Sequence, residues 1–96
     1  MTDYIFLMHD DADGDEAAWE PYLQALKRRG CFEGGSAIGE GACVRKTGAP
    51  PPVTAHLTGF IRVHAASLEE AKSMLSGNPH FEAGGTVEIR ELPKTD

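Results

Sequence analysis

The sequence predicts an α+β fold with the element order strand, helix, strand, strand, helix, strand. Three observations carry this prediction. Residues 4–9 form an apolar run of strand formers, residues 15–29 and 67–77 carry apolar residues at helical spacing, and residues 56–65 and 84–92 alternate between apolar and polar side chains. A further strand is expected in the glycine-rich segment that precedes residue 56.

Size and charge argue against several classes of protein. The chain has 96 residues and a mass of 10.3 kDa, which predicts one domain over residues 1–96. Nine Lys and Arg residues stand against fifteen Asp and Glu residues, so a basic surface for nucleic acid is not expected. No apolar run reaches the ~18 residues of a membrane helix, and the N-terminus lacks the positive segment of a signal peptide. We therefore expect a cytoplasmic protein that binds neither nucleic acid nor membrane.

The first strand and the first helix are separated by an acidic turn. The run "YIFLMH" at residues 4–9 is typical of a central strand that is buried on both faces. The segment "DDADGDE" supplies turn residues, a helix N-cap and carboxylates suited to the positive end of a helix dipole. The helix is expected over residues 15–29, with a start nearer Glu20 as the alternative, because Pro21 is tolerated only in a first turn. Its apolar stripe consists of Trp19, Tyr22, Leu23 and Leu26.

Two strands joined by a proline-rich loop are expected in the middle of the chain. The segment "CFEGGSAIGEGACVRK" predicts a strand over about residues 36–46, and "TGAPPPVTA" predicts the hairpin loop. In the strand over residues 56–65, one face is expected to carry Leu57, Ile61 and Val63. The opposite face is expected to carry His56, Thr58, Phe60, Arg62 and His64.

A second helix and a last strand complete the order. Ser67 and Glu70 form a capping-box signature at the start of the helix, and Gly77 ends it. The strand "GGTVEIREL" at residues 84–92 alternates between apolar and charged side chains. Its helix-facing residues are expected to be Val87 and Ile89, and its other face is expected to carry Glu88 and Arg90.

This order of elements is the ferredoxin-like plan, βαββαβ, with a four-stranded antiparallel sheet and two helices on one face. The other sheet face is then bare. Its expected members are Tyr4, Phe6, Met8, His56, Phe60, Arg62, His64, Glu88 and Arg90. Large aromatic side chains on an open sheet face predict a partner, and the simplest partner is a second copy related by a two-fold axis. Two such sheets would enclose a mixed apolar and polar cavity.

Several segments resemble the YCII-related family, which includes the DGPF proteins. The resemblance rests on the opening strand "YIFLMHDD", on "SLEEAKSML", on the turn "NPHFEAGG" and on the closing "VEIREL", and it spans nearly the whole chain. It implies a dimeric α+β barrel, in agreement with the homodimer argued from the bare sheet face.

The chain departs from this family at two places. The DGPF signature between the middle strands is absent, since the chain has "APPPVTAHLTGF" there. Family members proposed to be enzymes carry a His on the first helix, paired with an Asp. Here the matching position is Tyr22, and the strand after it offers no Asp. The resemblance therefore implies no such acid/base pair, and Tyr22 is expected among the ligand-binding residues instead.

Two histidines are the candidate catalytic residues. His80 lies between Pro79 and Phe81, before the last strand, where it is either a solvated loop residue or a general acid or base at a cavity mouth. His56 points into the cavity if the sheet pairs with a second copy, and it is ordinary strand decoration if the sheet faces solvent.

Strand-borne arginine and aromatic side chains are the candidate ligand-binding residues. Arg62 and Arg45 are expected on strands joined by a hairpin, and an arginine recognises a carboxylate through two parallel hydrogen bonds. The alternative for Arg62 is an ion pair with Glu88. Phe60 shares the face of Arg62 and is expected to contact the ligand. No metal site and no cofactor is expected, because the sequence has no cluster at metal-ligand spacing, and both cysteines are expected as free thiols.

The sequence leaves two functions open. In the first, a homodimer encloses a cavity for a small molecule, anionic or aromatic, and carries out cofactor-free acid/base chemistry of lyase or isomerase type. In the second, the dimer is an interaction module that has no ligand.

Overall fold

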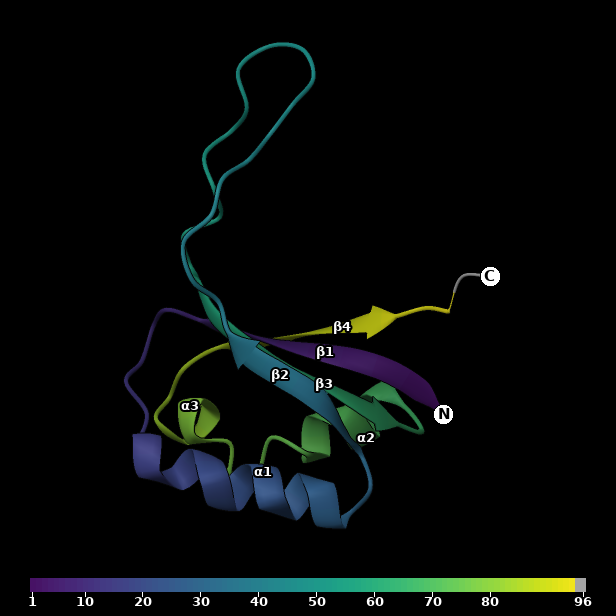
Figure 1. Cartoon of the computed structure of the whole chain (residues 1–96). Coiled ribbons are helices and arrows are strands. Elements are labelled where there is room, and N and C mark those ends of the chain that lie inside the picture. The colour runs from purple at the N-terminus through teal and green to yellow at the C-terminus, as the bar shows by residue number, and fades with distance from the viewer. Residues whose placement is uncertain (95–96) are drawn as a thin grey trace.

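The structure is a computed structural model that describes residues 1–94, so the last two residues of the expected 1–96 domain lie outside the described residues. Its elements in chain order are β1 (Thr2–His9), the 3-10 helix η1 (Glu16–Ala18), α1 (Trp19–Arg28), β2 (Phe32–Ala37), β3 (Leu57–Ala65), α2 (Leu68–Ser73), α3 (Pro79–Glu82) and β4 (Val87–Leu92). Figure 1 shows a helical layer against one face of a sheet, and a long loop that projects from the end of the sheet as an arm.

The four strands form one antiparallel sheet in the order β2-β3-β1-β4. At its centre, Phe6 of β1 pairs with Ile61 of β3 and Ile89 of β4, and all three side chains pack into the core beneath the helices. The helices cover this face of the sheet, and we call the other face the open face (Figure 1). The expected α+β, ferredoxin-like arrangement with a four-stranded antiparallel sheet and helices on one face is confirmed.

The side chains of β1 alternate between the core and the open face. Tyr4, Phe6 and Met8 are buried in the core, so the prediction that they lie on the open face is wrong. Ile5 and Leu7 lie there instead and are half-buried. The reason is that an uninterrupted apolar run satisfies either phase of a strand equally well, and only packing against the helices selects one.

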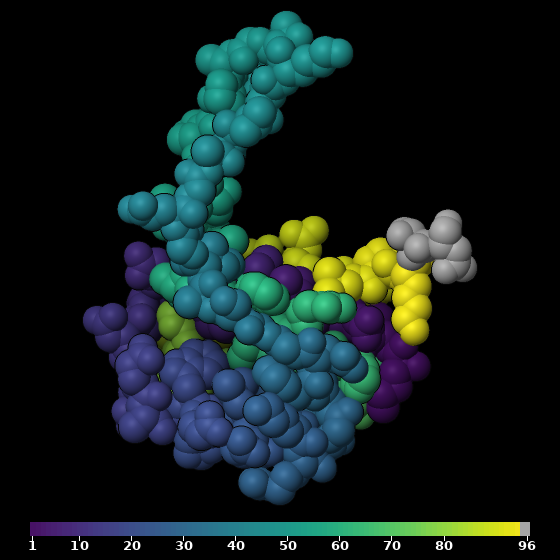
Figure 2. Space-filling view, in the orientation of Figure 1, coloured from purple at the N-terminus to yellow at the C-terminus, as the bar shows by residue number. Residues whose placement is uncertain are grey.

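The second strand and the loop after it also differ from the prediction. β2 spans Phe32–Ala37 rather than about residues 36–46, and residues 38–56 form no helix or strand. This segment, which we call the arm, is exposed over almost its whole length and projects away from the helical layer (Figures 1 and 2). Its glycines and prolines weaken a strand or cannot donate to its ladder. Cys43 lies on the arm and Cys31 in the core, and both are free thiols.

The helix starts agree with the capping signals in the sequence. The Oδ1 atom of Asp15 accepts a hydrogen bond from the backbone N–H of Ala17 at 3.0 Å. The hydroxyl of Ser67 accepts one from the backbone N–H of Glu70 at 3.2 Å. Pro21 lies in the first turn of α1, where its missing N–H has no cost. Within residues 1–94, none of the helices is long and apolar enough to span a membrane.

The segment between α2 and β4 contains a short helix where a loop was predicted. In α3, Pro79 occupies the first turn and the Oδ1 atom of Asn78 accepts a hydrogen bond from the backbone N–H of Phe81 at 3.0 Å. An Asn followed by a Pro is a helix-start signal that was available in the sequence. The helix carries His80 into the interior, where only 6% of the residue is exposed. The solvated-loop alternative for His80 is therefore wrong.

Candidate functional site

A pocket of about 480 Å³ lies between α1 and the β2–β3 half of the sheet, on the helix-covered face. Its apolar walls include Met8, Trp19, Leu23, Phe32 and Ile61. Its polar lining includes Asp10, Asp13, Glu16 and His80. Small-molecule sites usually measure roughly 300–1,000 Å³, so this pocket has the size of a ligand site. It is distinct from the cavity that was expected between two open sheet faces.

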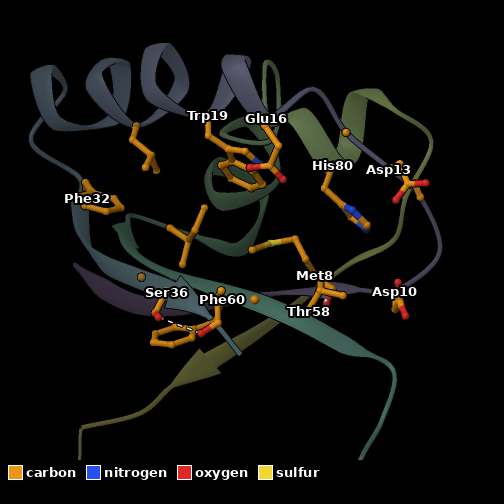
Figure 3. A pocket seen from close by; sticks show the side chains of 17 residues that line it. Met8, Asp10, Asp13, Glu16, Trp19, Phe32, Ser36, Thr58, Phe60 and His80 are labelled. Atoms are coloured by element: carbon orange, nitrogen blue, oxygen red, sulfur yellow. Dashed lines mark hydrogen bonds between the residues drawn. The ribbon is translucent and has the colours of Figure 1, made fainter. Parts of the chain in front are cut away.

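The polar and apolar parts of the pocket lie toward different ends. In Figure 3, His80, Asp10 and Asp13 gather toward one end and Phe32 lies at the other. Trp19 descends between them from the helical layer. A bound molecule would therefore meet an apolar wall at one end and charged or titratable groups at the other.

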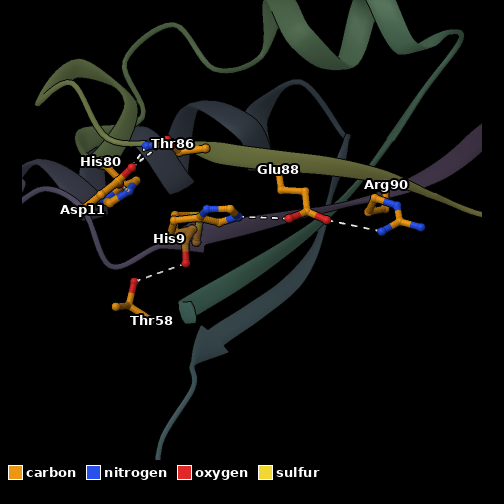
Figure 4. Close-up of polar contacts among 8 residues, drawn as sticks. His9, Asp11, Thr58, His80, Thr86, Glu88 and Arg90 are labelled. Atoms are coloured by element: carbon orange, nitrogen blue, oxygen red, sulfur yellow. Dashed lines mark hydrogen bonds and ion pairs between the residues drawn. The ribbon is translucent and has the colours of Figure 1, made fainter. Parts of the chain in front are cut away.

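His80 is held in the pocket wall by two contacts. Its side chain is 7% exposed, and its Nε2 atom lies 3.2 Å from the Oδ1 atom of Asp11 (Figure 4). The backbone of Gly85 also packs directly against the imidazole, near the same Nε2 edge. A Cβ atom at Gly85 would lie 2.5 Å from Cε1 and 2.6 Å from Cδ2 of the ring, so the close approach requires a glycine. The ring position is therefore determined by the turn after α3 together with the end of β1.

Asp11 is in turn positioned by Thr86, which precedes β4. The backbone N–H of Thr86 donates to Oδ1 of Asp11 at 2.9 Å, and the hydroxyl of Thr86 donates to Oδ2 at 2.6 Å. These two hydrogen bonds, with a smaller contribution from His80, lower the pKa of the Asp11 carboxyl, although burial acts in the opposite direction. Asp11 is therefore a carboxylate at neutral pH and orients the His80 ring.

This arrangement can move a proton. A carboxylate that faces one ring nitrogen favours the proton on that nitrogen, which leaves the other nitrogen with a free lone pair. Among residues 1–94, Nδ1 of His80 has no hydrogen-bond partner, since the ring contact to Asp11 uses Nε2. The imidazole can thus accept a proton from a ligand as a general base and return it as a general acid.

Three further carboxylates line the pocket without a partner. Within the described part of the chain, the side chains of Asp10, Asp13 and Glu16 make no hydrogen bond or ion pair, and no Lys or Arg lines the pocket. Sequence reasoning assigned the whole acidic segment to a turn and a helix cap, and this assignment holds for Asp15. The run of acidic residues after β1 was the signal available in the sequence, but which of them line the pocket depends on how the loop packs against the sheet.

A second polar group lies on the open face at the same end of the sheet. Nε2 of His9 lies 2.9 Å from Oε1 of Glu88, and Nη1 of Arg90 lies 3.2 Å from Oε2 of the same carboxylate (Figure 4). The hydrogen bond to His9, followed by that to Arg90, lowers the pKa of Glu88. His56 packs edge-on against the His9 ring, with the ring centroids 4.9 Å apart. The two histidines that were expected to be catalytic are therefore not brought together. His56 belongs to this open-face group, whereas His80 lines the pocket.

Of the four expected ligand-binding residues, Phe60 is among the residues that line the pocket, whereas Arg62, Arg45 and Tyr22 are not. Arg62 is exposed on the open face, opposite Ile5 of β1. The alternative ion pair between Arg62 and Glu88 is not formed, because the Glu88 carboxylate pairs with His9 and Arg90. The ring of Phe60 points to the far side of β3 from Trp19 (Figure 3). Arg45 lies on the arm rather than on a strand and donates to the Ala49 carbonyl.

Tyr22, the fourth, is a core residue. Its hydroxyl donates to the carbonyl of Met74 at 2.8 Å, and burial raises the pKa of its phenol to about 12. A side chain that is committed to joining α1 and α2 in this way is part of the packing between the helices.

The structure has no ready-made metal centre in the part of the chain that it describes, because no group of three His, Cys, Asp or Glu side chains in residues 1–94 is placed to hold an ion.

Comparison with known proteins identifies the fold. No protein-family model matches the chain, and no curated protein matches it. Among solved structures, the chain is similar to 5-chloro-2-hydroxyhydroquinone dehydrochlorinase (TftG) from Burkholderia phenoliruptrix AC1100, in complex with 2,5-dihydroxybenzoquinone, with 17% identity and a TM-score of 0.55 over 95% of each chain. At this identity the similarity concerns the fold: a four-stranded antiparallel sheet with helices on one face.

Proposed function

We propose that this chain is a YCII-related protein that binds a small molecule in the pocket beneath α1 and transfers a proton to and from it through His80. The observation that carries the proposal is the buried imidazole of His80, held 3.2 Å from the ionised Asp11 in the wall of a ligand-sized pocket. Buried titratable groups in a concave pocket are a physical signature of acid/base sites.

The geometry favours His80 as the reacting group and Asp11 as a positioning residue. Asp11 is 45% exposed in its side chain and accepts two hydrogen bonds from Thr86, whereas the imidazole of His80 faces the pocket. A base such as His80 can accept a proton from a carbon, nitrogen or oxygen acid without a metal or an organic cofactor. The solved neighbour TftG is a dehydrochlorinase whose structure holds 2,5-dihydroxybenzoquinone, which supports a small ring compound as the kind of ligand.

The proton-transfer role is tested with a neutral probe that has an acidic C–H bond, phenylacetone. Proton NMR in D₂O would follow the loss of its benzylic proton signal with wild-type protein and with the His80→Gln variant. Glutamine retains an amide that can donate to Asp11 but is not a base at neutral pH. We expect the wild type to accelerate exchange by about 100-fold over the variant, the lower end of general-base catalysis.

Two results would contradict the proposal in different ways. Binding of phenylacetone, read in H₂O from the indole N–H signal of Trp19, combined with equal exchange in wild type and His80→Gln in D₂O, would contradict the acid/base role. The absence of any change at Trp19 or His80 with phenylacetone, hydroquinone and phenol would contradict ligand binding itself. The variant Glu40→Gln, which carries its change on the exposed arm, serves as the control for general effects of substitution.

The open face supports a second candidate, a homodimer that serves as an interaction module without a ligand. Ile5, Leu7 and Phe60 place apolar surface among the charged groups of the open face, and such surface favours a partner. The dimer is compatible with either function, because the pocket lies on the other face. Sedimentation of wild type and Leu7→Glu should give a dimer and a monomer, respectively. A monomeric wild type would contradict this candidate.

A further inference from the structure

We propose that the pocket selects a small ring compound that carries a positive charge, such as an aromatic ammonium, over its neutral and anionic analogues. This inference rests on the proposed function, because it names the class of ligand for the same pocket. The site itself stands on the pocket and on His80 with Asp11, and the surrounding charges decide which ligands enter it.

The charges around the pocket have one sign. Asp10, Asp13 and Glu16 line it, and within residues 1–94 none of the three makes a hydrogen bond or an ion pair through its side chain. Asp11 adds a fourth carboxylate directly behind the His80 ring. An ammonium group at this end would meet several unneutralised carboxylates, whereas a carboxylate ligand would meet like charges, which are disfavoured at short range.

No cation lies where an anionic ligand would need one. Arg62 is on the open face, Arg45 is on the arm, and none of the Lys or Arg residues in the described part of the chain lines the pocket. The expectation of an anion held by Arg62 therefore does not apply to this pocket. Among the described residues that line the pocket, His80 is the only His, Lys or Arg, and the carboxylate of Asp11 lies 3.2 Å from its ring.

The apolar part of the pocket suits a ring. Trp19, Phe32 and Leu23 form its walls on the side of α1 and β2. Glu16 and Trp19 both line the pocket, so that a carboxylate and an indole are available to the same ligand. An indole is the best of the aromatic side chains at attracting a cation. A ring seated toward Phe32 can therefore extend an ammonium group past Trp19 toward the acidic end.

The test compares three ligands of nearly equal size, 2-phenylethylamine, 2-phenylethanol and phenylacetate, which carry charges of about +1, 0 and −1 at neutral pH. Titrations would follow the Trp19 indole N–H signal at low salt. We expect the amine to bind roughly tenfold more tightly than the alcohol, and phenylacetate to bind more weakly than the alcohol. The preference for the amine should fall as salt is raised, since exposed charges are screened.

Matched variants locate the effect. Glu16→Gln and Asp13→Asn should each weaken the amine by about two- to fivefold, the scale of an exposed ion pair, and should leave the alcohol unchanged. Glu40→Gln removes one negative charge from the arm and should change neither ligand.

The outcomes test the charge preference and the proposed function of the pocket separately. Equal binding of the three ligands, or preference for phenylacetate, would overturn the charge preference and leave the proposed function standing. Binding by none of them would contradict the charge preference together with the pocket as a site for ring compounds. An equal loss of amine affinity in Glu40→Gln would assign the preference to the net charge of the chain and so overturn the assignment to the pocket acids.

Discussion

Replacement of Gly85 with alanine should push His80 out of its place in the pocket wall. An alanine Cβ would meet Nε2 of the ring and lie 2.5 Å from Cε1 and 2.6 Å from Cδ2. Non-bonded carbon atoms prefer about 3.5–4.0 Å, so the ring must move by roughly 1 Å or turn away from Asp11. Overpacking of this kind costs about 1–3 kcal/mol of the free energy of unfolding.

The neighbouring Gly84 provides the matched control. It has a φ of +90°, and a Cβ there would meet no atom within 4 Å. Gly84→Ala should therefore cost about 1–2 kcal/mol through backbone strain alone and should leave His80 in place. Urea unfolding followed by Trp19 fluorescence measures both costs, and the His80 ring signals in NMR report whether the imidazole has moved.

A double-mutant cycle separates the clash from other effects of Gly85→Ala. In a His80→Ala background the ring is absent, so Gly85→Ala should cost little, and the coupling energy should be about as large as its cost in the wild type. The placement of His80 would be refuted if the two substitutions were additive, or if Gly85→Ala left the His80 signals and the binding of ring compounds unchanged.

Three further predictions follow from the core and from the pKa shifts. Phe6→Ala should lower the free energy of unfolding in urea by about 3–5 kcal/mol, because Phe6 is fully buried. Leu7→Ala should lower it by less than about half of that, because Leu7 is half-buried on the open face. The reverse order would contradict the assignment of these residues to the two faces of β1. The lowered pKa of Asp11 means that its contribution to stability is present above its ordinary value of 3.8 and is lost as pH falls through the lower folded value. Asp11→Asn should therefore show a flatter fall in stability between about pH 5 and pH 2 than the wild type, and parallel curves would refute the assignment. The pKa of Tyr22 is raised to about 12, so one tyrosine should ionise near that pH in an ultraviolet titration. If Tyr22→Phe showed the same ionisation at high pH, another residue would be responsible.

The candidate site could be predicted from the sequence only in part. His80 was identified as a candidate because it lies in a turn before the last strand, and its Asn-Pro start was legible as a helix signal. Its partner was not, since Asp11 and His80 are far apart in the chain and meet only because β1 and β4 are neighbours in the sheet. The acidic residues after β1 were visible in the sequence, but their place around a pocket depends on packing.

The sequence by itself determined the order of the four strands with α1 and α2, and the faces of β3 and β4, because alternation and capping are local properties that the neighbouring residues decide. The tertiary structure alone decided the phase of β1, since an unbroken apolar run fits both faces of a strand until helices cover one of them. It also placed β2 at the start of the glycine-rich segment, over Phe32–Ala37 rather than residues 36–46, because the ladder with β3 selects the strand. The pocket, finally, is a product of long-range packing, because its walls come from β1, β2, β3 and α1 and its titratable group from α3.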